Sequence, residues 1–156
     1  MSKNREIQFA SVFISHGQPD REFAITLQQK LEDRNIDNFL LPNDGVPGQF
    51  LHEAMRQAVN SHDKVILICS KQSLDRTGVL NEIEETLRRE SREGGRSILV
   101  PITLDDYVFN EWAPAKSDHQ TAVLDRIVGD FRNTPNNSEQ FDKQFGRLLT
   151  ALERTE

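Results

Sequence analysis

Short apolar runs alternate along this chain with segments in which apolar residues recur every three or four positions. The runs are predicted to form buried β-strands, because each is short, mostly apolar and bounded by loop-forming residues. The expected strands are Phe9–Ser15, Asp37–Leu41, Val65–Cys69, Ile98–Ile102 and a short fifth strand at Val128–Phe131.

The segments between these strands have the spacing of amphipathic helices. The first such helix carries Phe23, Leu27 and Leu31, and Asp20 is its expected N-cap. The third is expected to be capped by Thr77 and to stop at the glycine pair 94–95. Further helices are predicted around Leu51–Ala58, over Thr121–Val128 and from Phe141 to Leu152, whereas 42–48 and 103–118 are predicted to be loops.

Strands that alternate with helices predict an α/β fold, a flavodoxin-like, doubly wound parallel sheet of four to five strands with helices on both faces. A single domain is expected over residues 7–156, after a flexible N-terminus at residues 1–6. The loops that follow the strands then meet at the carboxyl edge of the sheet, where folds of this class bind their ligands. A functional site is therefore expected in the loops after the first three strands.

The composition is that of an ordinary globular domain, with 36% hydrophobic and 28% charged residues. A formal net charge of −6 argues against nucleic acid or an anionic membrane surface as a partner. The single cysteine fits a reducing compartment, and no apolar run has the length that spans a bilayer, so a cytoplasmic location is expected. Cys69 ends a buried strand and is expected to be a small core residue rather than a nucleophile.

The common nucleotide-binding motifs are missing from this sequence. Residues 15–19 read Ser-His-Gly-Gln-Pro where a dinucleotide-binding domain would carry GxGxxG, and the chain has no GxxxxGK P-loop. A phospho-accepting receiver domain would have an aspartate at the end of the third strand, where Cys69 and Ser70 stand. The four histidines lack the spacing of metal ligands, so no metal site is expected.

The predicted third helix carries two acids that could serve a site. With about 100° per residue, Glu82 projects on one flank of the apolar face of the helix and Glu84 on the other. Glu84 with Arg88 and Glu85 with Arg89 are expected to form i,i+4 pairs on the exposed side, whereas Glu82 has no basic residue at that spacing. Helix geometry alone leaves Glu82 and Glu84 as equal candidates.

The chain resembles a Toll/interleukin-1 receptor (TIR) domain in the order and spacing of several features, from about Ile7 to Leu152. The resemblance is closest to the bacterial and archaeal branch, whose members commonly cleave NAD+ at the nicotinamide–ribose bond. Some of them make cyclic or modified ADP-ribose signals in antiphage immunity. The resemblance therefore implies an NAD+ glycohydrolase or ADP-ribosyl cyclase that has NAD+ as substrate and needs no cofactor. The matching features are the Phe9–Ser15 strand, the Ser-His loop, Asp44-Gly45-x-Pro47-Gly48, the Val65–Ser70 strand with Ser73, and Val79-x-x-Glu82.

The resemblance also implies which residues form the site. The catalytic glutamate of the family's Trp-x-x-x-Glu pattern falls on Glu82, with Gly78 in the tryptophan position. The family's Gly-x-aromatic sequence matches Gly48-Gln49-Phe50, which makes Phe50 a candidate wall of the site. The basic residue that some members carry after the first strand is absent. The expected substrate-binding residues are Ser15, His16, Gly17, Gly48, Phe50, Ser70 and Gly78.

A second hypothesis is a non-enzymatic module that self-associates with other TIR domains through the Asp44–Phe50 loop. Glu82 favours the enzyme and Gly78 favours the module, and the two combine if the loop of one subunit completes the site of the next. One carboxylate suffices for the cleavage, because nicotinamide leaves as a neutral group and the oxocarbenium-like charge needs stabilisation. Packing in the core or in a loop, rather than an interface, is expected for Tyr107, Phe109 and Trp112.

Overall fold

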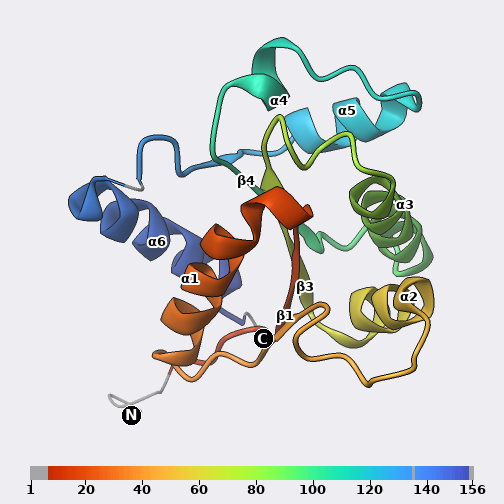
Figure 1. Cartoon of the computed structure of the whole chain (residues 1–156), viewed down its shortest axis with the longest axis horizontal. Helices are drawn as coiled ribbons and strands as arrows, with labels where there is room; N and C mark the ends of the chain where they lie inside the picture. The colour runs from red at the N-terminus through yellow and green to blue at the C-terminus, as the bar shows by residue number, and fades with distance from the viewer. Residues whose placement is uncertain (1–6, 135, 155–156) are drawn as a thin grey trace.

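The computed structural model describes residues 7–134 and 136–154, and it contains one sheet of five parallel strands in the order β2-β1-β3-β4-β5 (Figure 1). The predicted flavodoxin-like α/β fold is confirmed. The N-terminal stretch predicted to be flexible, residues 1–6, lies outside the described residues. The strands are β1 (Val12–Ser15), β2 (Asn38–Leu40), β3 (Lys64–Cys69), β4 (Leu99–Thr103) and β5 (Gly129–Asp130).

Helices cover both faces of the sheet, α1 and α6 on one and α2 and α3 on the other (Figure 1). Successive strand residues point to opposite faces, so Ile14 and Ile66 pack with α1 and α6, whereas Phe13 and Leu67 pack with α2 and α3. In the described part of the chain, no helix is both long and apolar enough to cross a membrane. The helical elements are η1 (Gln18–Asp20), α1 (Arg21–Glu32), α2 (Leu51–Ser61), α3 (Thr77–Arg92), α4 (Tyr107–Asn110), α5 (Ser117–Leu124) and α6 (Ser138–Leu152).

The first strand and the last helix differ from prediction at their starts. β1 begins at Val12 because Phe9 forms an isolated antiparallel bridge with Glu153, just beyond α6. α6 begins at Ser138 because the Asn137 side chain accepts a hydrogen bond from a backbone amide of the first turn, at 3.1 Å. The pattern of apolar residues predicts neither difference, because the Phe9–Glu153 bridge joins residues distant in sequence and the cap of α6 is a polar side chain.

The segment after β4 departs most from prediction. The predicted loop at 103–118 contains the one-turn helix α4, and α5 begins at Ser117 instead of residue 121. α4 is too short to show a helical period, and α5 buries only His119 and Val123. Trp112 is 1% exposed and belongs to the core beneath α2 and α3, which confirms the packing role expected for it.

The two predicted side-chain caps are absent. Asp20 precedes α1, yet its carboxylate accepts hydrogen bonds from the hydroxyls of Ser70 and Ser73 instead of from the helix. Thr77 is the first residue of α3, and Arg76 holds the N-cap position without a side-chain hydrogen bond to the helix. The Asp20 carboxylate, which the local sequence predicted to cap α1, therefore binds the loop after β3 instead.

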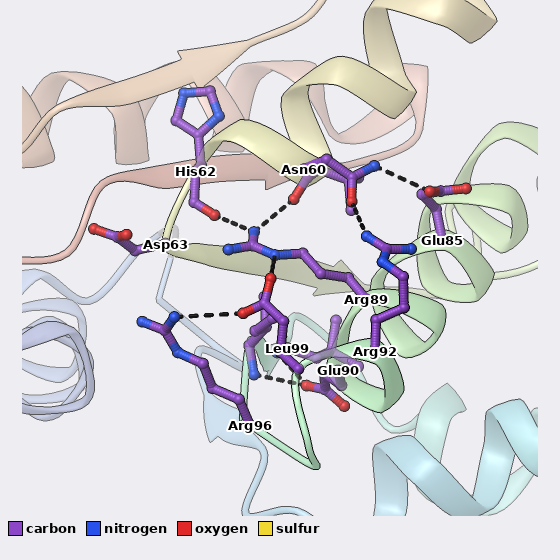
Figure 2. Close-up of polar contacts among 12 residues, drawn as sticks. Asn60, His62, Asp63, Glu85, Arg89, Glu90, Arg92, Arg96 and Leu99 are labelled. Carbon is purple, nitrogen blue, oxygen red and sulfur yellow. Dashed lines mark hydrogen bonds and ion pairs between the residues drawn. The ribbon is translucent and has the colours of Figure 1, made fainter.

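A buried arginine fastens the C-terminal half of α3 to the end of α2 (Figure 2). Arg89 donates hydrogen bonds to the backbone carbonyls of Val59, at 2.8 Å, and His62, and it forms an ion pair with Glu93 at 2.8 Å. The predicted Glu85–Arg89 pair is therefore wrong. Residue 89 lies on the side of α3 that packs against α2. Its guanidinium therefore binds the two backbone carbonyls at the end of α2 instead of Glu85.

The next residue of α3 holds the start of β4 (Figure 2). One carboxylate oxygen of Glu90 accepts hydrogen bonds from the backbone amides of Ile98, at 2.7 Å, and Leu99, at 2.8 Å. The other oxygen forms an ion pair with Arg126, at 2.5 Å. These contacts fix α3 against the sheet, and with it the first turns of the helix that carry Glu82.

Candidate active site

A cleft of about 760 Å³ opens beside the carboxyl end of β1, between the first turns of α2 and α3. This volume is in the range of small-molecule sites, about 300–1,000 Å³. The lining residues lie within 13–18, 41–42, 51–55 and 75–82, so they come from β1, the loops after β1, β2 and β3, and the two helices. The cleft occupies the edge of the sheet where a site was expected.

Glu82 lines this cleft from the second turn of α3, and its side chain is partly buried. Its Oε1 atom accepts a hydrogen bond from the hydroxyl of Ser15, the last residue of β1. Burial raises the pKa of the Glu82 carboxyl to about 8, and the Ser15 hydrogen bond opposes part of this rise because it favours the charged form. A carboxyl with so raised a pKa, placed in a cleft, is a candidate functional group.

One carboxylate and two hydroxyls hold the loop after β1 against the loop after β3. Asp20 accepts the hydrogen bonds of Ser70 and Ser73, and the Ser73 hydroxyl accepts one from the Gly17 amide at 2.9 Å. Residue 17 must be glycine, since a Cβ there would lie 2.6 Å from Ser73 Oγ and 2.9 Å from Ser73 Cα. This clamp positions the backbone that follows Ser15.

Two further residues predicted for the site, His16 and Gly78, also line the cleft. Burial lowers the pKa of the His16 imidazole, so the ring is neutral at pH 7 and offers hydrogen bonds rather than a fixed charge. Gly78 lies one turn before Glu82, and a Cβ on it would meet no atom within 4 Å. The site therefore has open space where the family's pattern has a tryptophan.

Three residues predicted for the site neither line this cleft nor, like Ser15, form a hydrogen bond with Glu82. Ser70, the first residue of the loop after β3, is buried and donates a hydrogen bond to Asp20. Gly48 has a φ of +90°, a conformation that favours glycine. The backbone conformation of the loop therefore accounts for a glycine at this position without a role in ligand binding. Phe50 is 79% exposed at the N-terminus of α2 and faces solvent rather than Glu82. The structure thus brings Ser15, His16, Gly17, Gly78 and Glu82 together and leaves Gly48, Phe50 and Ser70 apart.

Sequence reasoning missed several polar residues that line the cleft, among them His52, Arg76 and Asn81. Arg76 and Asn81 lie within six residues of Glu82 on the same helix or its N-cap, so their proximity was a usable signal. His52 had no such signal, because only the packing of α2 against α3 brings it to the cleft.

Glu84, the acid that helix geometry left equal to Glu82, lies outside the cleft and takes part in surface ion pairs. It forms the predicted pair with Arg88, at 2.9 Å, and a second pair with Lys116. His119 Nε2 lies 3.7 Å from the same carboxylate. The hydrogen bond from Lys116 is the main reason that the pKa of Glu84 lies below its usual value. The two acids thus differ in environment: burial raises the pKa of Glu82, whereas the hydrogen bond from Lys116 lowers the pKa of Glu84.

Solved structures of three proteins share this fold at 19–22% sequence identity, a level that shows the fold alone. The TIR domains of the activated Roq1 resistosome that recognises the effector XopQ align with a TM-score of 0.69 and 19% identity, over 89% of this chain and 99% of that one. The TIR domain of the Toll-related receptor TRR-2 from Hydra magnipapillata gives 0.62 and 20%, over 88% and 96%. A prokaryotic SEFIR domain gives 0.63 and 22%, over 92% and 98%.

The comparison with curated proteins found no match. The family model described as "TIR domain" matches residues 12–149, from the first residue of β1 to the last turn of α6. This span includes every strand of the sheet and every segment that lines the cleft. The chain therefore belongs to the TIR domain family.

Proposed function

We propose that this chain is a cytoplasmic NAD+ glycohydrolase or ADP-ribosyl cyclase of the prokaryotic TIR branch, acting in antiphage immunity. The observation that carries the proposal is the placement of Glu82, which lines a cleft of substrate size and accepts a hydrogen bond from Ser15. The assignment to the prokaryotic branch and to immunity rests on the sequence resemblance.

The chemistry proposed for Glu82 needs one carboxylate. In NAD+ the bond between the anomeric carbon of the ribose and the pyridinium nitrogen breaks, and its electron pair leaves with nicotinamide, which becomes neutral. Positive charge then develops on the ribose, and an ionised Glu82 stabilises it. Water attacks the anomeric carbon and releases a proton to give ADP-ribose, or a nucleophile within the ADP-ribose closes a ring.

The pH dependence of the reaction follows from the ionisation of Glu82. Because the carboxylate must be charged and its pKa in the free protein is about 8, kcat/KM should rise through pH 8 and level off above it. The cationic nicotinamide ring of bound NAD+ favours the carboxylate, so kcat should rise at lower pH than kcat/KM. Ser15→Ala removes a hydrogen bond that favours the charged form, and the kcat/KM profile should move to higher pH.

Initial rates of nicotinamide release between about pH 6 and pH 9, corrected for the alkaline lability of NAD+, measure these profiles. Ser61→Ala is the matched control, since Ser61 is exposed at the end of α2 and does not line the cleft. A kcat/KM that does not change across this range, or a Ser15→Ala profile displaced to lower pH, would contradict the role given to the carboxylate.

The direct test of the proposed function is incubation of concentrated protein with NAD+, with nicotinamide release followed over time and product mass determined. We expect nicotinamide together with ADP-ribose or a cyclic or modified form of it. High concentration matters because TIR domains generally self-associate, and assembly can be needed for activity.

A non-enzymatic assembly module is the second candidate, and one surface favours it. Val46, Phe50 and Leu51 lie close in sequence at the start of α2 and are 63–79% exposed, a grouping of apolar side chains that suits a protein partner. Concentration-dependent assembly by light scattering, without nicotinamide release at any concentration, would favour this module over the enzyme.

A further inference from the structure

A single guanidinium lines the cleft that Glu82 lines. Among the lining residues in the part of the chain that the structure describes, Arg76 is the one arginine, and no lysine is present. Its Nε atom donates to the backbone carbonyl of Gln72, at 3.0 Å. No described residue forms an ion pair or hydrogen bond with its two terminal nitrogens, which leaves four N–H groups for a ligand.

The stem of Arg76, an exposed residue, passes close to the loop after β1. Its Cδ atom would lie 3.0 Å from a Cβ on residue 17, so the arginine stem runs across the glycine. The neighbouring acid, Asp75, also lines the cleft; it accepts a hydrogen bond from the Tyr107 hydroxyl and forms no ion pair with Arg76. No residue of the described cleft wall therefore forms an ion pair with the guanidinium.

Arg76 and Glu82 place opposite charges at two points along one helix. Arg76 is the N-cap of α3 and Glu82 lies six residues further on, a rise of about 9 Å along the helix axis. In NAD+ a positively charged nicotinamide and a negatively charged diphosphate lie on the two sides of one ribose. A separation of this order matches a ribose with its phosphates, with the pyridinium toward Glu82 and the diphosphate toward Arg76.

We propose that Arg76 binds the diphosphate of the substrate and so orients the nicotinamide–ribose bond toward Glu82. The proposal rests on the proposed function and deepens it, because it selects a dinucleotide over a simple nicotinamide riboside. A guanidinium suits this role, since its planar N–H groups match two phosphate oxygens at once. It also supplies, from the loop after β3, a cation that the loop after β1 lacks.

The test compares Arg76→Gln with Lys71→Gln. Lys71 is exposed in the same loop and does not line the cleft, so its variant makes the same charge change away from the site. Arg76→Gln should lower kcat/KM for NAD+ by about 10- to 100-fold, mainly through KM, as expected for the loss of a charged hydrogen bond. Cleavage of nicotinamide riboside, which has no phosphate, should stay the same in both variants and in the wild type.

A binding measurement separates this proposal from the reaction itself. ADP-ribose is titrated calorimetrically into the wild type and both variants, and Arg76→Gln alone should lose about 10- to 100-fold in affinity. Equal affinity of Arg76→Gln and wild type overturns the role of Arg76, and so does a wild type that fails to bind. Arg76-dependent binding without NAD+ cleavage supports the anion site and rejects the proposed reaction. Unchanged melting temperatures confirm that the variants are folded.

Discussion

Glu82→Gln is expected to lower the rate of NAD+ cleavage by at least about 100-fold, because the variant removes the charge that stabilises the developing cation on the ribose. Glutamine keeps the size of the side chain and can still accept a hydrogen bond from Ser15, so the cleft should keep its shape. The loss should appear in kcat more than in KM, since the missing interaction belongs to the transition state. Nicotinamide release under substrate saturation measures it.

Glu84→Gln is the matched control on the same helix. Glu84 is bound by Arg88 and Lys116 outside the cleft, so its variant should retain most of the wild-type activity. Equal activity of the wild type and Glu82→Gln would reject the catalytic assignment. Comparable losses in both variants would point to assembly or stability rather than to the reacting atoms.

Stability measurements give Glu82→Gln a second, independent signature. The pKa of Glu82 is about 8 in the folded chain and near 4.5 without the fold, so the native state holds the extra proton between these values. The stability of the wild type should therefore fall as pH rises through this window, by the linkage between proton binding and folding. Glutamine carries no such proton, and Glu82→Gln should become the more stable protein toward pH 8.

Glu90→Leu is expected to destabilise the fold by about 3–5 kcal/mol, the range for breaking a buried ion pair. The substitution leaves Arg126 without its partner and the amides of Ile98 and Leu99 without an acceptor. Each buried amide that lacks a partner costs about 1–3 kcal/mol, although the sum is limited by relaxation of the strand. Urea unfolding at pH 7 measures the change in the free energy of unfolding.

Glu85→Leu is the matched control for Glu90→Leu, since it makes the same change on the same helix. Glu85 is only partly buried and accepts one hydrogen bond, from Asn60 at 3.0 Å, so its loss should cost less than about 1 kcal/mol. A cost below about 1 kcal/mol for Glu90→Leu as well would show that the network of Figure 2 does not hold α3 to the sheet.

The sequence predicted those strands and helices whose buried residues form a regular apolar pattern along the chain. The strands β1 to β4 are short apolar runs, and α1, α2 and α6 repeat apolar residues at helical spacing, so each one could be placed without knowing its neighbours. α4 and α5 could not be placed in this way. α4 is a single turn, and α5 is positioned by contacts such as that of His119 with Glu84.

The residues of the candidate site, too, could be predicted only in part from the sequence. Ser15, Gly17 and Glu82 were named from the order of motifs along the chain, and the structure brings them to one cleft or its wall. Phe50 was named on the same grounds but faces solvent, because the conformation of a loop does not follow from its sequence alone. Arg76 was not named, although it lies only six residues before Glu82, because a guanidinium near the start of a helix is common and the cleft beside it is visible only in the structure.

By itself, the sequence determined the alternating pattern of strands and helices and the resemblance to TIR domains, because both are properties of residues close together along the chain. Helix geometry left Glu82 and Glu84 equal and the family resemblance favoured Glu82, but only the tertiary structure shows that these two acids, two residues apart on one helix, lie in different surroundings. β1 and its loop approach one flank of α3 and enclose Glu82 with Ser15, while α5 approaches the other and surrounds Glu84 with cations. Burial raises one pKa and ion pairing lowers the other, and both effects depend on neighbours that are distant in sequence.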